Sequence, residues 1–398
     1  LLMSEDVLSA IKCLKKLGIK VNLSRHKCEI FGNGLNGFKY KKNIILNAGN
    51  SGTLGRLILP LLVKSPVKIK LIGDKSLSKR DFIRIIDPLK KFGATFFPKK
   101  SSKIPIYIKG SDFIRPINYL ENKGSAQCKS AVMLAAMNAP GITRIKAKKS
   151  RNHTENFFKN LNIPIKIKKN KNFDFIEVKG QKNFLGFNYK IPGDISSSAF
   201  FVVLTILSKN SKLIIKNINI NPSRDGVIKI LKKMGAKIFY SNIKIYKGEK
   251  IADIHVESSK SIKSINCPTN LNSSAIDEFL IIFLVAAKAN GVSYFSNLEE
   301  LNQKESKRLN LGSRILNLMG IKTQLTNNSI KIYGKPDLQI KKKCIIKDYL
   351  GDHRIMAMCT IAALSLGGKW EIHNPNSINT SFPSFFKILK KDFGAKII

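Results

Sequence analysis

An amphipathic helix that ends at a glycine or asparagine recurs six times along this chain of 398 residues. In the first copy Val7, Ile11 and Leu14 share one face, Ser4 is a candidate N-cap, and Gly18 ends the pattern. The copies span residues 4–18, 80–93, 153–162, 223–235, 305–320 and 381–394. Because their ends lie about 70–85 residues apart, the sequence predicts a long-period repeat of whole supersecondary units.

A second kind of helix, apolar on nearly every side, is expected between consecutive amphipathic helices. These helices begin near Gly52, Gln127, Ser196, Ile276 and Arg354. Short apolar strands such as residues 212–216 fill the gaps. A helix without a polar face should be buried, so the pattern predicts an α/β fold with apolar helices inside.

The six repeats group naturally as three plus three. Pro192, Gly193 and Asp194 lie near the midpoint, where a crossover between two similar domains is plausible. We therefore expect two domains, residues 1–190 and 191–398. The first amphipathic helix has no apolar partner before it and residue 1 is Leu1, so we also expect that the first domain lacks its opening strand and helix.

A polar, glycine-rich stretch follows the short strand expected at residues 43–46. Residues 47–56 read NAGNSGTLGR and precede the apolar run 57–63, which is expected to be a buried helix. Such a loop lets backbone N–H groups approach a ligand, and a helix N-terminus favours anions. The stretch therefore indicates either a phosphate or carboxylate site or an ordinary turn with a capped helix. It is not a nucleotide P-loop, because no Gly-Lys-Ser/Thr closes it.

The formal charge of +44 limits the classes of function that fit this chain. Its lysines are spread along the whole length, and no aromatic-basic motif or zinc-finger spacing occurs, which argues against specific nucleic-acid binding. A positive field that steers small anionic substrates is the better interpretation. Of 70 basic residues only eleven are arginines, and five of them fall in polar motifs near helix starts: Arg56, Arg80, Arg151, Arg308 and Arg354.

Six scattered cysteines, without a CxxC pair, indicate reduced thiols in a cytoplasmic protein and no structural zinc. No apolar run in the sequence reaches the length of a membrane span.

Ten short motifs resemble those of the 5-enolpyruvylshikimate-3-phosphate (EPSP) synthase family, and they occur in that family's order. They are GNSGT at 49–53, GDKSLSKR at 73–80, GSAQCKSA at 124–131, SRNHTE at 150–155, PGDISSSAFF at 192–201, NPSRDG at 221–226, AIDE at 275–278, KESKR at 304–308, DHRIMAM at 352–358 and TSFP at 380–383. The resemblance covers essentially the whole chain.

This resemblance implies two similar domains, each of three βαβαββ-like units around buried helices, in the inside-out α/β arrangement of enolpyruvyl transferases. It implies transfer of the enolpyruvyl group of phosphoenolpyruvate to the 5-hydroxyl of shikimate 3-phosphate, with release of phosphate, on the shikimate pathway of aromatic amino-acid biosynthesis. Neither a metal nor an organic cofactor is expected, and we expect a cytoplasmic monomer without membrane or specific nucleic-acid partners.

Roles for individual residues follow from the motifs that match. For phosphoenolpyruvate, the resemblance implies binding by Gly52, Arg80, Gln127, Arg308 and Arg354. For shikimate 3-phosphate, it implies contacts from Ser125, Ala126, Gln127, Ser150, Arg151, Asp277 and Lys304. Asp277 would accept the hydroxyl proton, and Lys304 with Glu305 would assist proton transfer to the methylene carbon. Taken singly, the arginines could form surface ion pairs and Asp277 could be a helix-start carboxylate.

Some positions depart from the family pattern. The opening Lys-Ser-x-Ser-x-x-Arg motif has no counterpart in the sequence, so we expect the chain as written to be nearly inactive. Asn302, Gln303 and Lys307 replace the usual residues before Arg308, which leaves the ion pairing there in doubt. Thr380 stands where one branch of the family has lysine, and His353 is expected to be structural rather than catalytic.

Three other interpretations remain open at this stage. UDP-N-acetylglucosamine enolpyruvyl transferase shares the fold, but it would need a loop cysteine and a different acceptor motif. A basic nucleic-acid-binding protein would need a recognition motif. A chain that binds the substrates without turning them over would need direct measurement.

We predict that any binding to nucleic acid is weak, independent of sequence and sensitive to salt. Dispersed lysines act on phosphates only through counterion release. Titration of unrelated DNA duplexes should give similar affinities that collapse as salt is added. A clear preference for one duplex at moderate salt would contradict this interpretation of the charge.

Overall fold

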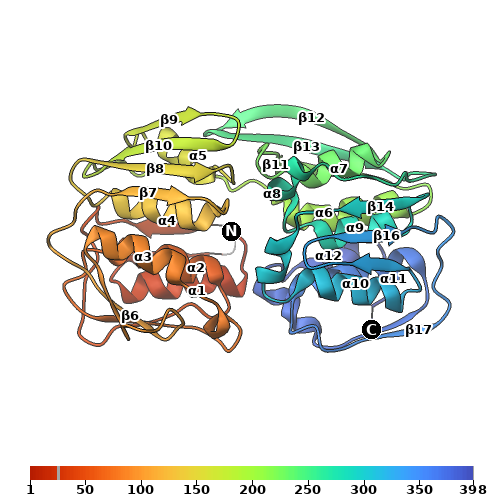
Figure 1. Ribbon diagram of the computed structural model, residues 1–398, viewed down its shortest axis with the longest axis horizontal. Helices are drawn as coiled ribbons and strands as arrows, with labels where there is room; N and C mark the ends of the chain where they lie inside the picture. The colour runs from red at the N-terminus through yellow and green to blue at the C-terminus, as the bar shows by residue number, and fades with distance from the viewer. Residues whose placement is uncertain (25–26, 398) are drawn as a thin grey trace. The chain divides into compact units, whose positions relative to one another are not determined.

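The computed structural model describes residues 1–24 and 27–397. The chain divides into two units, Leu1–Ile191 and Pro192–Ile398, each with its own internal contacts. The units are described separately below (Figure 1).

The first unit consists, in chain order, of α1 Glu5–Lys16, β1 Lys20–Leu23, β2 Cys28–Phe31, β3 Ile45–Asn47, α2 Gly52–Ile58, the 3₁₀ helix η1 Leu59–Leu62, β4 Ile69–Ile72, η2 Leu77–Lys79, α3 Ile83–Phe92, β5 Thr95–Phe97, β6 Ile106–Lys109, β7 Asn118–Glu121, α4 Ala126–Ala136, β8 Ile142–Lys148, α5 His153–Asn160, β9 Ile165–Lys169 and β10 Phe173–Lys179.

The second unit consists of α6 Ile195–Leu207, β11 Lys212–Asn219, α7 Gly226–Lys233, β12 Lys237–Tyr246, β13 Glu249–Glu257, η3 Thr269–Leu271, α8 Asn272–Ala275, α9 Phe279–Ala287, β14 Val292–Phe295, η4 Glu299–Gln303, α10 Arg308–Leu318, β15 Thr323–Leu325, β16 Ile330–Tyr333, β17 Lys343–Ile346, α11 His353–Leu366, β18 Lys369–Ile372, η5 Pro375–Thr380 and α12 Phe385–Asp392.

The sheets repeat one topology, which confirms the predicted βαβαββ units. In the first unit the strand orders are β3-β4-β6-β5 and β7-β8-β10-β9, and in each sheet the first pair is parallel and the others antiparallel. In the second unit the orders are β11-β13-β12 and β14-β16-β15. There the leading strand is reduced to a parallel bridge, from Gly193 to Ile218 and from Asn266 to Tyr294. Strands β17 and β18 form a further parallel pair.

The six amphipathic helices are α1, α3, α5, α7, α10 and α12, and each ends where the sequence predicts. The backbone is left-handed at every predicted end, with φ of 80° at Gly18, 117° at Gly93, 54° at Asn162, 92° at Gly235, 83° at Gly320 and 64° at Gly394. Ser4 caps α1 and accepts a hydrogen bond from the Val7 N–H. Several helices start later than predicted, as α3 does at Ile83, because the polar residues before them form loops and 3₁₀ turns.

The apolar helices lie inside, as predicted. All nine residues of α9 are buried, and α6, α9 and α11 pack against one another in the second unit. In the first unit α4 packs against α2, α3 and the sheet that contains β7, β8 and β10, beneath which it lies in Figure 1. The helix expected over residues 57–63 is shorter: α2 ends at Ile58 and continues as η1. Pro60 explains the change, because proline has no N–H to donate to an α-helical turn.

Within the described residues, no single helix is long and apolar enough to cross a membrane, although the bent pair Thr269–Ala275 and Phe279–Ala287 passes the same test together. The bend between these two segments is 120°, and Asp277 and Glu278 lie at its corner.

Candidate functional site

The predicted site residues lie mostly at the N-terminal ends of the apolar helices. Gly52 is the first residue of α2, Ser125 is the N-cap of α4, and Arg354 lies in the first turn of α11. The first N–H groups of a helix have no partner inside the helix, so these ends are suited to anions. Arg308 is the first residue of the amphipathic helix α10, and the other predicted residues lie in the connections that lead into α3, α5, α9 and α10, or beside Ser125 in α4.

In the first unit, two arginines converge on the backbone of Gly52. A Cβ atom added at Gly52 would lie 2.7 Å from Arg80 Nη1 and 2.8 Å from Arg56 Nη1. Arg56 Nη1 also donates to Gln127 Oε1 at 3.1 Å, and Gln127 Nε2 donates to Thr53 Oγ1 at 2.9 Å. The structure thus brings together Gly52, Arg80 and Gln127, with Arg56 as the link. The sequence singled out Arg56 by its position but gave it no role, and it gave no signal for Thr53.

Loop contacts hold Arg80 near Gly52. Asp74 accepts hydrogen bonds from Asn50 Nδ2 at 2.5 Å and from the Leu77 N–H at 2.7 Å. Ser51 caps α2 and accepts from the Leu54 N–H at 3.2 Å. The polar stretch at 47–56 is therefore a capped helix start, and it also lies against two guanidinium groups that could hold an anion.

The segments expected to bind the acceptor substrate also lie in the first unit. Ser125, Ala126 and Gln127 begin α4, while Ser150 and Arg151 lie between β8 and α5. Ser150 Oγ is buried and makes no hydrogen bond to any residue that the structure describes. The two segments are joined one turn further along: Lys129 of α4 forms an ion pair with Glu155 of α5 at 2.5 Å. Beside it, Ser130 Oγ and Thr154 Oγ1 lie 2.7 Å apart.

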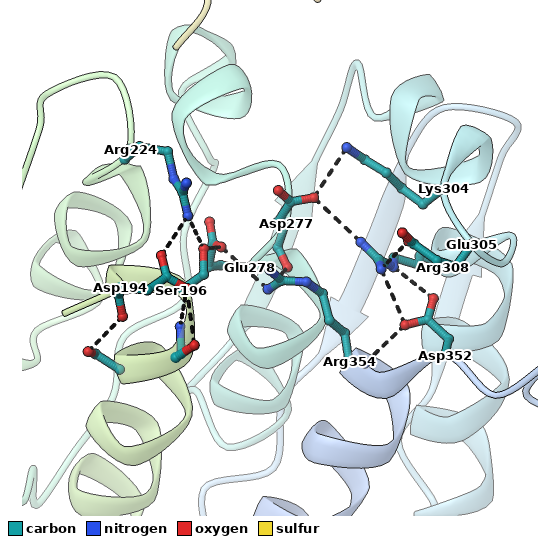
Figure 2. A network of polar contacts seen from close by, with 12 residues as sticks. Asp194, Ser196, Arg224, Asp277, Glu278, Lys304, Glu305, Arg308, Asp352 and Arg354 are labelled. Atoms are coloured by element: carbon teal, nitrogen blue, oxygen red, sulfur yellow. Dashed lines mark hydrogen bonds and ion pairs between the residues drawn. The ribbon is translucent and has the colours of Figure 1, made fainter. Parts of the chain in front are cut away.

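In the second unit, Arg308 is held by three carboxylates (Figure 2). Its Nε donates to Asp352 Oδ2 at 2.8 Å and its Nη2 to Asp352 Oδ1 at 3.3 Å, while Nη2 also contacts Glu305. The Arg308 side chain is 2% exposed and that of Asp352 is 0% exposed. Burial acts to lower the pKa of Arg308, but the carboxylates of Asp352, Glu305 and Asp277 raise it above its usual value. Burial acts in turn to raise the pKa of Asp352, and Arg308 holds it below its usual value.

Asp277 lies among cations at the corner between α8 and α9. Its Oδ1 is 3.2 Å from Lys304 Nζ and 3.5 Å from Arg308 Nη1. Its backbone oxygen accepts from Arg354 Nη1 at 2.8 Å. The structure therefore brings together all five predicted site residues of this unit, Asp277, Lys304, Glu305, Arg308 and Arg354. Next to a lysine and two arginines, a carboxylate is favoured in its charged, proton-accepting form.

A buried carboxylate beside Asp277 was missed by sequence reasoning. Glu278 is 1% exposed, lies 3.5 Å from Arg354 Nη1 and accepts a hydrogen bond from Ser196 Oγ. Arg224 donates to the same hydroxyl and to Asp194 Oδ1 at 3.0 Å (Figure 2). Each of these residues falls in a matching motif, but nothing in the sequence shows that residues 28 to 82 positions apart come together.

Two expectations about individual residues can be compared with the structure. Burial, followed by repulsion from Arg354, lowers the pKa of His353 to about 4, so this imidazole is neutral at neutral pH. Asn302, where the family pattern has another residue, accepts from the Leu309 N–H at 3.2 Å and donates to Asn310 at 3.0 Å. Asn302 thus stabilises the start of α10 through hydrogen bonds between uncharged groups.

Comparisons with known proteins show the family to which the sequence is similar. The family model for EPSP synthase (3-phosphoshikimate 1-carboxyvinyltransferase) matches residues 1–389. The 3-phosphoshikimate 1-carboxyvinyltransferase of Bacillus cytotoxicus is 35% identical over 387 residues, which are 97% of this chain and 89% of the relative. That of Vesicomyosocius okutanii is 38% identical over 389 residues, which are 96% of this chain and 86% of the relative.

Solved structures give the same result for the fold. The EPSP synthase of Acinetobacter baumannii superposes with a TM-score of 0.85 and 34% identity, over 98% of this chain and 88% of that one. The enolpyruvyl transferase NikO of Streptomyces tendae has a TM-score of 0.71 over 99% of this chain and 88% of that one, and its 13% identity shows a shared fold alone. The predicted α/β fold of the enolpyruvyl transferase type is therefore confirmed, and the chain belongs to the EPSP synthase family.

Proposed function

We propose that this chain transfers the enolpyruvyl group of phosphoenolpyruvate to the 5-hydroxyl of shikimate 3-phosphate and releases phosphate. The observation that carries the proposal is the placement of Asp277, with a lysine and an arginine within 3.5 Å of its carboxylate and Arg354 bound to its backbone oxygen. One carboxylate among several cations suits a reaction in which a hydroxyl loses its proton beside an anionic donor substrate.

Within the first unit, Gly52, Arg80 and Gln127 are proposed to bind phosphoenolpyruvate. Within the second unit, the family resemblance suggests Arg308 and Arg354 for the same substrate. The absence of a side chain at Gly52 leaves room for two guanidinium groups. Asp352 occupies one edge of the Arg308 guanidinium through Nε. The N–H groups of Nη1 and Nη2 that contact Asp277 and Glu305 are therefore the ones that could donate to a ligand oxyanion instead. Planar guanidinium groups suit phosphate and carboxylate because they can donate two parallel hydrogen bonds.

Within the first unit, Ser125, Ala126, Gln127, Ser150 and Arg151 are proposed to bind shikimate 3-phosphate. Within the second unit, the family resemblance suggests Asp277 and Lys304 for the same substrate. The first turn of α4, which Ser125 caps by accepting from the Cys128 N–H, and the Ser150 hydroxyl are proposed to contact the phosphate.

For the chemical step, we propose that Asp277 takes the hydroxyl proton as the new C–O bond forms. Lys304 and Glu305 then assist proton transfer at the methylene carbon. These roles need no metal or organic cofactor, because side chains supply both the proton transfer and the positive charge. We also propose that the protein acts as a cytoplasmic monomer, in agreement with its free cysteines.

Turnover with both substrates tests the proposed reaction. Phosphorus NMR should show inorganic phosphate appearing together with a new phosphate monoester, in equal amounts and only when both substrates are present. Phosphate release from phosphoenolpyruvate alone would contradict the proposal. Because the chain as written is expected to be nearly inactive, the assay must detect slow turnover, and the absence of even slow turnover at saturation with both substrates would also contradict it.

Replacing Asp277 by Asn should slow the chemical step. Asparagine keeps the size and one acceptor oxygen but not the basicity, so kcat should fall by roughly 10²–10⁴-fold. The affinity for shikimate 3-phosphate should change far less, because its proposed phosphate contacts are elsewhere. Single-turnover kinetics and calorimetry measure the two quantities, with the exposed Asp337→Asn as the matched control. A near-normal chemical step in Asp277→Asn would move the role of base to Glu305.

Gly52→Ala should weaken phosphoenolpyruvate binding without unfolding the first unit. The added methyl group would displace the ends of the Arg80 and Arg56 side chains, which are flexible enough to move. Because displacements of about 1 Å can cost up to 10²-fold in a preorganised site, we expect KM for phosphoenolpyruvate to rise by about 10- to 100-fold. Gly32→Ala is the control, since a Cβ there meets no atom within 4 Å. An unchanged KM would show that Gly52 does not shape this site.

A further inference from the structure

The ion pair between Lys129 and Glu155 is buried inside the first unit. The Lys129 side chain is 0% exposed and that of Glu155 is 3% exposed, with Nζ and Oε1 at 2.5 Å. The second carboxylate oxygen of Glu155, Oε2, is buried and has no hydrogen-bond partner among the described residues. Taking two charges out of water is costly, and well-packed apolar residues of similar volume often give equal or greater stability. Stability alone therefore does not explain why this pair is charged.

The position of the pair indicates a different purpose. The Lys129 N–H donates to the backbone oxygen of Ser125 at 3.2 Å, so Lys129 lies one helical turn from the start of α4. Glu155 lies in the first turn of α5, directly after the connection that contains Ser150 and Arg151. The pair thus joins the two segments proposed above to receive the acceptor phosphate.

A second polar contact runs parallel to the first. Ser130 and Thr154, the neighbours of the paired residues, are joined by a 2.7 Å hydrogen bond between their hydroxyls. Lys129 Nζ lies 2.5 Å from Glu155 Oε1 but makes no hydrogen bond of acceptable geometry within the described part of the chain, so the ion pair sets the distance between the two helix starts and the directional hydroxyl contact sets their rotation. Apolar contacts would hold the helices together but would allow them to slide, since they have no preferred direction.

We infer that Lys129 and Glu155 are positioning residues that set the spacing between the start of α4 and the β8–α5 connection for the phosphate of shikimate 3-phosphate. This inference rests on the proposed function. Neither side chain touches the substrate in this account; each acts through Ser125, Gln127, Ser150 and Arg151.

The decisive variant removes both charges together. Lys129→Met alone leaves Glu155 buried and unpaired, which should destabilise the unit strongly. In the double variant Lys129→Met/Glu155→Leu no charge is left unpaired, so thermal stability should return close to that of the parent. We expect its Kd for shikimate 3-phosphate, measured by calorimetry, and its KM for this substrate to rise about tenfold, as contacting residues commonly couple by this amount. Its kcat and its KM for phosphoenolpyruvate should stay within about twofold.

The matched control is Arg144→Met/Glu177→Leu, which removes one charge of each sign from an exposed pair at 3.0 Å in the same unit. This control should leave both substrate affinities unchanged. Should the double variant fail to fold, Lys129→Gln/Glu155→Gln, which also leaves no buried charge unpaired, is scored by the same criteria.

The outcomes separate the two proposals. A stable double variant with normal affinity for shikimate 3-phosphate, or with equal losses for both substrates, would overturn the positioning role. Absence of even slow turnover in the unmodified protein with both substrates would instead overturn the proposed function.

Discussion

A helix that is apolar on every side must be buried, and this constraint determines where the functional residues lie. Helix α9 has no exposed residue, and α6 and α11 are nearly as enclosed. Such a helix can occupy only the centre of its unit, with sheets and amphipathic helices around it. Its N-terminus cannot remain inside without partners, because its first N–H groups need acceptors. The ends are therefore polar, and five of the ten matching motifs lie there; the other five lie at or just before the starts of the amphipathic helices.

At the site in the second unit, carboxylates accompany the cations. Arg308 is almost fully buried, and leaving such a charge unpaired would cost about 3–5 kcal/mol. Asp352 pairs with Arg308 and accepts two hydrogen bonds from its guanidinium. Asp352 also caps α11, because it accepts a hydrogen bond from the Arg354 N–H at 3.0 Å. One carboxylate thus orients the Arg308 guanidinium and fixes the backbone at Arg354. Glu278 and Ser196 extend the same network toward Arg224 (Figure 2).

Local sequence patterns were sufficient to predict the repeat and the alternation of amphipathic and apolar helices. The end of every amphipathic helix was predictable because glycine and asparagine adopt the left-handed conformation at low cost. Helix starts were less predictable: the polar residues before Ile83 and Arg308 satisfy loop and 3₁₀ hydrogen bonds first. Pro60, which shortens α2, was visible in the sequence, but the apolar run around it led us to expect a helix over the whole of residues 57–63.

The contacts within the site could not be derived from periodicity. Arg56 and Gln127 are 71 positions apart, and Ser196 and Glu278 are 82 apart. Their meeting depends on how successive units stack, which no local pattern encodes. The roles of Gly52, Arg80 and Asp277 came from resemblance to a family. The link through Arg56 and the network of Glu278 required the folded structure.

Hydrogen–deuterium exchange with and without shikimate 3-phosphate tests most directly the claim that the starts of the buried helices form the site. The account predicts slower exchange at residues 126–127 and 150–152 when the substrate is bound, because its phosphate would accept hydrogen bonds at these two segments. The C-terminal ends of α4 and α5 and the exposed face of β8 and β10 should exchange as before. Protection confined to those outer strands, with none at the helix starts, would contradict the account.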